Sequence, residues 1–148
     1  MLVVDHLPQA VSREDLEGKE ADKVVLTWEQ RRWTRGRLLT AGGREVAVAL
    51  ETGAALEPGS ILCVEPGWYL VVEAAKEKTL AISPPSQDSA LRVAFEVGNR
   101  HFPLAIDGAS LLVPDDTAMI QLLDRLGVPW EPRIAVFAPI GGGHQHAH

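Results

Sequence analysis

Histidine is the residue type in this sequence best suited to chemistry. His101 ends the segment 95–101 (FEVGNRH), and the chain closes with three glycines followed by His144, His146 and His148. Neutral imidazole coordinates nickel, zinc and copper, and short histidine-rich tracts bind such ions. The four side chains therefore predict a protein that handles a transition metal, with His101 at a fixed position and the other three on a flexible glycine joint.

Both groups of histidines also have an interpretation without a metal. A lone histidine at the end of a helix is stabilised there by the helix dipole. A histidine tail can be a purification tag, although this tail alternates histidine with Gln145 and Ala147 instead of running through six histidines. One imidazole cannot hold a metal ion firmly. Two chains that meet across a two-fold axis would oppose their His101 side chains and so supply two.

The other reactive side chains give weaker evidence for a functional site. His6 follows Asp5 near the N-terminus, where a surface position explains it, and Cys63 lies in an apolar run, where a buried hydrophobic side chain is the default. A basic cluster could contact phosphate or an acidic partner, or could be the solvated face of a strand and loop. Its members are Arg31, Arg32, Arg35 and Arg37, with Trp28 and Trp33 beside them.

The motifs of the common enzyme classes do not occur. There is no nucleophile elbow, P-loop, zinc-protease helix or dinucleotide fingerprint, and the acidic residues form no obvious acid and base pair. We therefore predict that the protein is not an enzyme.

The composition bounds where the protein works and what it binds. Its 148 residues are 46% apolar and carry a formal net charge of −6, which suits one or two globular domains and argues against nucleic-acid binding. The first residues lack the basic and apolar regions of a signal peptide, and no run approaches the roughly 18 apolar residues of a membrane helix. A single cysteine forms no internal disulfide. We expect a cytoplasmic protein without membrane association.

The first half of the sequence predicts short strands separated by glycine and proline turns. Val24, Leu26 and Trp28 alternate along one strand, and Gly42 and Gly43 form the turn of a β-hairpin. The polar stretch 11–21 fits an irregular connection or a single helical turn. Strands are expected over 23–28, 37–40, 44–50, 60–64 and 68–73. Their spacing of about ten residues predicts a small all-β domain.

The second half alternates strands with helices. Ser86 caps a first helix, and Pro103 ends it by His101 or Phe102. Asp115 or Asp116 caps a second helix, which Gly127 terminates. Apolar stripes are expected at Leu91, Ala94, Phe95, Gly98 and Phe102 of the first helix, and at Ala118, Met119, Leu122, Leu123 and Leu126 of the second. Strands are expected over 78–83, 104–107, 110–113 and 133–138.

The order β-α-β-β-α-β in this half is that of a ferredoxin-like domain, with two helices on one face of a four-stranded sheet. The sequence therefore predicts an α+β protein in three parts. An all-β domain covers 1–74, a ferredoxin-like domain covers 75–140, and a flexible histidine-bearing tail covers 141–148.

Several segments resemble the UreE family of urease accessory proteins. Segment 95–101 is similar to the family signature, and segments 26–32 (LTWEQRR) and 43–47 (GREVA) are similar to the family's N-terminal domain. The resemblance implies a metallochaperone that dimerises through its ferredoxin-like domains and binds nickel between the two His101 side chains. It also implies delivery to apo-urease with a partner GTPase, and an N-terminal domain of peptide-binding type that contacts a partner.

The sequence departs from the family pattern in two respects. Some members carry a long, densely histidine-rich tail, whereas this tail has three histidines. Some members carry further histidines before the second helix, where this chain has the segment 113–117 (VPDDT). We therefore expect few ions per dimer, with Asp115 and Asp116 as helix caps and not as ligands.

Two other functions stay open at the level of the sequence. A binding module could engage RNA or protein through the ferredoxin-like sheet or the Arg31 to Arg37 cluster, although residues 76–113 offer only Phe95 and Phe102 for stacking on bases. A metal-dependent enzyme needs an oriented carboxylate or base beside its metal, and none is visible. Zinc or copper could take the place of nickel, because imidazole sites follow one general affinity order for these ions.

Overall fold

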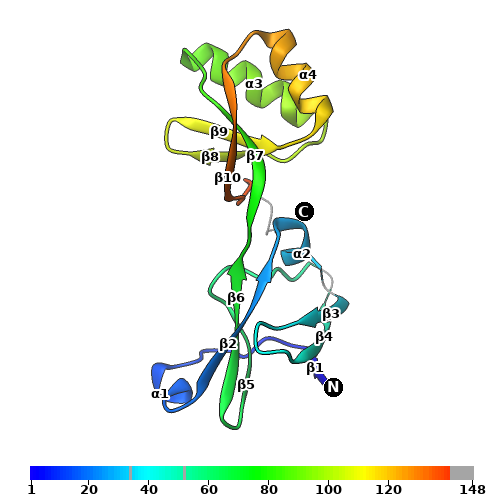
Figure 1. The fold of residues 1–148 in the computed structure, drawn as a ribbon, viewed down its shortest axis with the longest axis vertical. Coiled ribbons are helices and arrows are strands. Elements are labelled where there is room, and N and C mark those ends of the chain that lie inside the picture. Colours follow the sequence, from blue (N-terminus) through cyan, green and yellow to red (C-terminus); the bar gives the residue numbers. More distant parts are fainter. Residues whose placement is uncertain (34, 52, 141–148) are drawn as a thin grey trace. The chain divides into compact units, whose positions relative to one another are not determined.

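The computed structural model describes residues 1–33, 35–51 and 53–140, which form two compact units (Figure 1). The first unit comprises Met1–Ala75, and the second begins at Lys76. Each unit buries its own cluster of aliphatic side chains. The chain is therefore built around two separate cores.

The first unit is a sandwich of two three-stranded sheets. One sheet has the order β1 (Leu2–Val4), β4 (Glu45–Ala49), β3 (Arg35–Leu39), and the other has the order β2 (Glu20–Leu26), β6 (Trp68–Ala74), β5 (Ile61–Glu65). In each sheet one pair is parallel and one antiparallel. Val46 and Val48 of the first sheet share a core with Leu70 and Val72 of the second. The antiparallel β3–β4 hairpin confirms the predicted one, and its turn places Gly43 at a φ of 86°.

Two single-turn helices, α1 (Arg13–Leu16) and α2 (Trp28–Arg31), interrupt the strands. At α2, Thr27 Oγ1 accepts a hydrogen bond from the Gln30 N–H at 3.2 Å, and Gln30 Oε1 accepts one from the Thr27 N–H at 2.9 Å. This capping box turns the chain into a helix. The predicted continuation of the strand to Trp28 is therefore wrong, because β2 ends at Leu26.

The second unit has the order β7 (Lys76–Ile82), α3 (Gln87–Asn99), β8 (Ala105–Asp107), β9 (Ser110–Pro114), α4 (Thr117–Leu126) and β10 (Trp130–Val136). Its sheet runs β10-β7-β9-β8 with every neighbouring pair antiparallel. Both helices pack on the face of the sheet that carries Leu80 and Ile82. This arrangement confirms the predicted ferredoxin-like β-α-β-β-α-β fold.

The helix ends of this unit follow their sequence signals. Ser86 Oγ accepts a hydrogen bond from the Ser89 N–H at 3.0 Å, and Asp116 Oδ1 accepts one from the Ala118 N–H at 2.8 Å. The last strand begins at Trp130, three residues before the predicted start. It tolerates Pro132, which lacks an N–H, because β10 lies at the edge of the sheet.

The predicted apolar stripe of α3 is not the face that packs on the sheet. The helix buries Val93 and Val97 completely, whereas Leu91 is 63% exposed and Phe95 is 67% exposed. In α4, by contrast, the buried residues Met119, Leu122 and Leu123 belong to the predicted stripe. The larger side chains of α3 therefore face away from the core of their own unit.

Candidate metal centre

His101 follows the C-terminus of α3 in a tight hydrogen-bonded turn. Its N–H donates to the Gly98 carbonyl at 2.9 Å, and the Phe102 N–H donates to the Val97 carbonyl at 3.2 Å. These two bonds define a Schellman motif, in which the residue after the helix cap takes a left-handed conformation. His101 has a φ of 61°, and Ala10 is the only other non-glycine among the described residues with positive φ.

The end of α4 shows what such a turn ordinarily contains. The Gly127 N–H donates to the Asp124 carbonyl at 3.1 Å, and the Val128 N–H donates to the Leu123 carbonyl at 3.3 Å, with a φ of 68° at Gly127. The two turns have the same bonding pattern. Glycine adopts this backbone without steric cost, whereas a side chain costs about 1 kcal/mol. His101 therefore occupies a position where glycine would be more stable, and such strain is typical of functional sites.

The imidazole of His101 is exposed and makes no hydrogen bond or ion pair with any residue that the structure describes. The cation nearest in sequence is held elsewhere, because Arg100 Nη1 lies 2.6 Å from Glu96 Oε1 and donates to the Glu96 carbonyl at 3.0 Å. The negative end of the α3 dipole also favours a cation at this end of the helix. Both ring nitrogens of His101 are thus available for coordination.

Within residues 1–33, 35–51 and 53–140, no three His, Cys, Asp or Glu side chains gather closely enough to hold a metal ion. Asp116 serves as the cap of α4, as expected. The three tail histidines, His144, His146 and His148, lie outside the described residues. A coordination shell around His101 therefore needs ligands from beyond the part of the chain that the structure describes.

The last described residue, Ile140, is hydrogen-bonded to the loop that follows His101. The Ile140 N–H donates to the Leu104 carbonyl at 2.8 Å, and Leu104 is three residues after His101. The segment after β10 thus returns to the connection between α3 and β8. This bond anchors the starting point of the tail near the loop that carries His101.

The apolar stripe of α3 ends beside this loop. Leu91, Phe95 and Gly98 recur at helical spacing, so they share one face of the helix. A Cβ added at Gly98 would meet no atom within 4 Å. Glycine in a helix costs about 1 kcal/mol relative to alanine, and nothing in this unit requires it there. The stripe therefore has the composition of a contact surface for another molecule.

The basic cluster of the first unit is not one surface. Arg31 is buried, and its Nη1 donates to the Leu26 carbonyl at 2.9 Å, so the interpretation of this arginine as part of an exposed patch is wrong. The Arg32 guanidinium stacks on the Trp28 ring at 5.1 Å from its centre. Only Arg35 and Arg37 extend from β3 as exposed neighbours on one side of the strand.

The other sequence candidates have ordinary surroundings. His6 Nδ1 lies 2.7 Å from Asp5 Oδ1 at an exposed position. Cys63 is buried, as expected, and burial raises the pKa of its thiol to about 11. The thiolate that binds metals or attacks electrophiles is therefore scarce at neutral pH. Neither side chain adds a ligand to His101.

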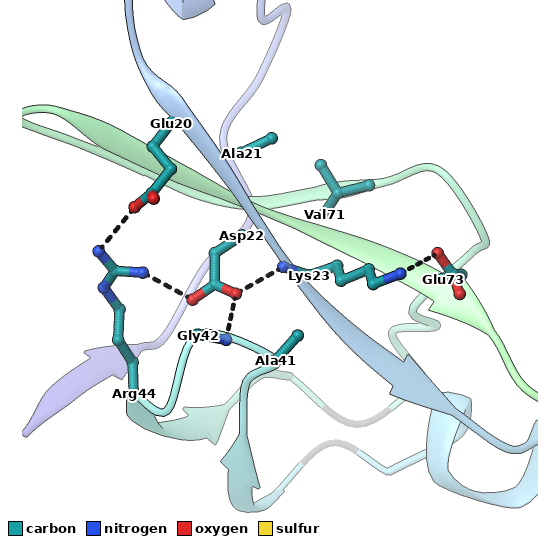
Figure 2. A pocket seen from close by; sticks show the side chains of 9 residues that line it. All are labelled: Glu20, Ala21, Asp22, Lys23, Ala41, Gly42, Arg44, Val71 and Glu73. Carbon is teal, nitrogen blue, oxygen red and sulfur yellow. Dashed lines mark hydrogen bonds and ion pairs between the residues drawn. The ribbon is translucent and has the colours of Figure 1, made fainter.

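A buried carboxylate in the first unit escaped the interpretation of the sequence. Asp22 Oδ2 accepts a hydrogen bond from Thr40 Oγ1 at 2.6 Å. It also accepts one from Arg44 Nη1 at 2.8 Å, while Oδ1 accepts one from the Gly42 N–H at 2.9 Å (Figure 2). A Cβ at Gly42 would lie 2.9 Å from Asp22 Oδ2. Its position, two residues before the buried Val24 in an alternating strand, indicates that the Asp22 side chain faces inward.

Asp22 joins β2 to the turn of the β3–β4 hairpin. Burial alone raises the pKa of its carboxyl, but the hydrogen bonds from Thr40, Arg44 and two backbone amides outweigh that effect and lower the pKa to about 2. The Arg44 guanidinium also lies over the Trp68 ring at 4.2 Å. Asp22 and Arg44 line an open cavity of about 550 Å³, yet the two side chains are bonded to each other. We assign the cluster a structural role.

The sequence matches the profiles of one family in both halves. Residues 4–75 match the UreE urease accessory protein, N-terminal domain, and residues 77–148 match the UreE urease accessory protein, C-terminal domain. The chain belongs to the UreE family. Membership of this family of urease accessory proteins, which are not enzymes, confirms the prediction of a non-enzymatic role.

Individual UreE proteins cover most or all of the chain. It is 35% identical to the urease accessory protein UreE of Ralstonia nicotianae over 156 residues, which is 100% of this chain and 72% of that protein. It is 30% identical to UreE of Acetivibrio thermocellus over 151 residues, 99% of both chains. A bifunctional urease accessory protein UreEF of Bordetella bronchiseptica is 37% identical over 139 residues, 90% of this chain and 32% of that protein. None of the described helices is long and apolar enough to cross a membrane.

Proposed function

We propose that this UreE protein binds nickel between the His101 side chains of two chains and delivers it to apo-urease, together with a partner GTPase, in the cytoplasm. The observation that carries the proposal is the left-handed His101 at the end of α3, where the equivalent turn of α4 has Gly127. A residue that destabilises its own turn and presents an unpaired imidazole to solvent fits a ligand better than a structural residue.

The second ligand of the same kind comes from a second chain. A two-fold axis beside the end of α3 would bring the two imidazoles together, since residues near the axis oppose their own copies. The exposed stripe of Leu91 and Phe95 supports this placement of the axis, because it runs along α3 toward the His101 turn. Gly98 supports it as well, since the missing side chain lets another backbone approach closely.

The tail completes the proposed coordination shell. Eight residues follow Ile140, and an extended chain spans up to about 26 Å over that number. Because Ile140 is bonded to Leu104, the tail starts within reach of His101. We propose that His144, His146 and His148 provide further imidazoles to the shared ion. Weak, exchangeable ligands from a tail suit a carrier that must release its metal to the next protein.

We infer from the family that the chain acts together with other urease accessory proteins. The name of the Bordetella relative, bifunctional urease accessory protein UreEF, supports it, since the present chain spans only 32% of that protein. We propose nickel as the bound ion, and not zinc or copper, because urease maturation is the family's role. The single cysteine, buried and unpaired, is in keeping with the reducing cytoplasm.

Reconstitution of urease activation tests the proposal. Apo-urease, its other accessory proteins and limiting nickel are incubated with the nickel-loaded chain, and urea hydrolysis is measured. Wild type and His6→Ala, the matched control for loss of an exposed histidine, should both activate. His101→Ala should stay at the level seen without the chain. Full activation by His101→Ala would contradict the proposal.

A further inference from the structure

The side chain of Arg100 is bonded to the last turn of α3. Its Nη1 donates to the Glu96 carbonyl at 3.0 Å and lies 2.6 Å from Glu96 Oε1. One guanidinium nitrogen thus contacts both the backbone and the side chain of the residue four positions earlier. The two side chains are 35% and 29% exposed, so water screens their ion pair only in part. We call these two contacts the Arg100 clamp.

The backbone at the end of α3 leaves the Glu96 carbonyl without the partner that a regular helix provides. In an α-helix the N–H of residue 100 would donate to the carbonyl of residue 96. Here the Arg100 N–H donates to the Val97 carbonyl at 3.2 Å, and the His101 N–H donates to the Gly98 carbonyl at 2.9 Å. Bonds that reach back three residues tighten the last turn, and the carbonyl they pass over needs another donor. The guanidinium of Arg100 supplies that donor.

The equivalent turn of α4 has leucines at both positions of the clamp. There Gly127 takes the left-handed place of His101, and Leu122 and Leu126 stand where α3 has its glutamate and arginine. Glycine adopts this backbone without steric cost, so that turn needs no support from side chains. Of the two matching turns, the clamp belongs to the one that has the strained residue.

We propose that Arg100 is a positioning residue of the nickel site, which holds the left-handed turn that directs the His101 imidazole toward the shared ion. The inference rests on the function proposed above. The imidazole makes no hydrogen bond or ion pair with any described residue, so its direction depends on the turn. A ligand that is already in place binds more tightly than one that must first be ordered, because the competent fraction of the chain scales the apparent affinity.

Charge alone predicts the opposite effect of this arginine. A guanidinium beside the site repels Ni²⁺ and would weaken its binding. Its removal would also leave the Glu96 carboxylate free to attract the ion. Arg100→Ala should therefore strengthen nickel binding if Arg100 acts by its charge, and weaken it if Arg100 acts by holding the turn. The sign of the change separates the two roles.

Two measurements on the full chain test the inference. Calorimetric titration with NiCl₂ gives the affinity, and amide hydrogen exchange without metal reports the opening of the turn through the N–H groups of His101 and Phe102. In Arg100→Ala the nickel affinity should fall by about tenfold, and exchange at these two amides should become faster by about tenfold. The amides of Val93 and Leu122 should stay protected, which shows that the variant is folded.

Two further variants separate the bonds of the clamp from its charges. Arg92→Ala removes an arginine of the same helix, which also has an acid four residues away, at 3.9 Å. It changes the net charge equally, and both measurements should match wild type. Glu96→Gln keeps an oxygen that accepts from the guanidinium but loses the negative charge. Its nickel affinity should stay within about threefold of wild type, because the bonds are weakened and not removed.

Three results would overturn the inference. They are tighter or unchanged nickel binding in Arg100→Ala, unchanged exchange at His101 and Phe102 in that variant, and loss of nickel binding in Glu96→Gln, which would make the glutamate a ligand. Nickel binding that depends on His101 but not on Arg100 refutes the clamp alone. Nickel binding that survives His101→Ala refutes the proposed function and, with it, the role of the clamp at the metal.

Discussion

His101 at the end of α3 and Gly127 at the end of α4 occupy the same left-handed position of the same hydrogen-bonded turn. The two helices lie in one small unit and end with the same bond pattern, so each position is a matched control for the other. The histidine position is the more strained of the two. The strain is local to the proposed metal ligand.

The first prediction is that His101→Gly stabilises the metal-free second unit by about 1 kcal/mol, because glycine adopts the left-handed backbone without a clash. Gly127→His should destabilise the same unit by a similar amount. Amide hydrogen exchange at the buried residues Val93 and Leu122 reports the opening of this unit alone. A His101→Gly chain no more stable than wild type would show that the turn carries no strain.

The second prediction concerns the exposed stripe of α3. Phe95→Glu places a charge in the proposed contact and should convert the proposed dimer to a monomer. Val25→Glu replaces another exposed apolar residue, on β2, and should leave the dimer intact. Light scattering during gel filtration measures the mass of both. A dimer that survives Phe95→Glu would place the contact elsewhere.

The third prediction separates the two roles of Gly98. In a single chain, Gly98→Ala should stabilise α3 by about 1 kcal/mol, since alanine is the better helix former and its Cβ has open space. In the dimer, the same methyl group should obstruct the close approach and raise the dissociation constant by about tenfold. Sedimentation equilibrium gives the dissociation constant and hydrogen exchange gives the stability. An equally tight dimer in Gly98→Ala would remove the argument from glycine.

The fourth prediction follows from the lowered pKa of Asp22. The carboxyl has a pKa of about 2 in the folded chain, against an ordinary value of 3.8. Its contribution to stability is therefore complete above about pH 4, where both states are ionised. It is lost as pH falls toward about 2, because the unfolded state binds the proton first.

Asp22→Asn should accordingly lower the free energy of unfolding of the first unit by about 2 kcal/mol at neutral pH. The difference from wild type should shrink between about pH 4 and pH 2. Urea unfolding across this range measures it, with the exposed Asp88→Asn as a variant that should behave like wild type. A difference that stays constant down to pH 2 would mean that the ionised carboxylate is not what stabilises the hairpin.

The strands and helices could be predicted where local rules act alone. Side-chain alternation gave the β3–β4 hairpin, and the caps at Ser86 and Asp116 gave the helix starts. Trp28 continues the side-chain alternation and so predicts a longer strand, but β2 ends at Leu26 because the capping box of Thr27 and Gln30 begins α2. A short-range hydrogen-bond signal outweighed the hydrophobic pattern.

Hydrophobic spacing alone does not predict which face of α3 packs on the sheet. Leu91 and Phe95 form the more hydrophobic stripe of α3, yet the core takes Val93 and Val97. Helical spacing cannot distinguish a stripe that faces its own sheet from one that faces another molecule. The positive φ of His101 comes from the two local hydrogen bonds of its turn, at a position where the sequence has no glycine to signal it. Alternation with Val24 indicates that Asp22 faces inward, but its partners Thr40 and Arg44 come from the distant β3–β4 hairpin.

The fifth prediction concerns pH. Imidazole must be neutral to coordinate a metal, and its unperturbed pKa is roughly 6.5. Nickel affinity should therefore weaken steeply below about pH 6. Competition with a nickel-binding indicator dye between about pH 5 and pH 8 measures this. Flat affinity over that range would contradict coordination by histidine.

Calorimetric titration of nickel into wild type, His101→Ala, His6→Ala and a chain ending at Gly143 tests the central claim most directly. We predict one tight ion per two chains in wild type and His6→Ala. Removal of the tail should lower the affinity for that ion by about tenfold, and His101→Ala should abolish the tight site. Tight binding of the same stoichiometry in His101→Ala would contradict a metal shared between the two His101 side chains.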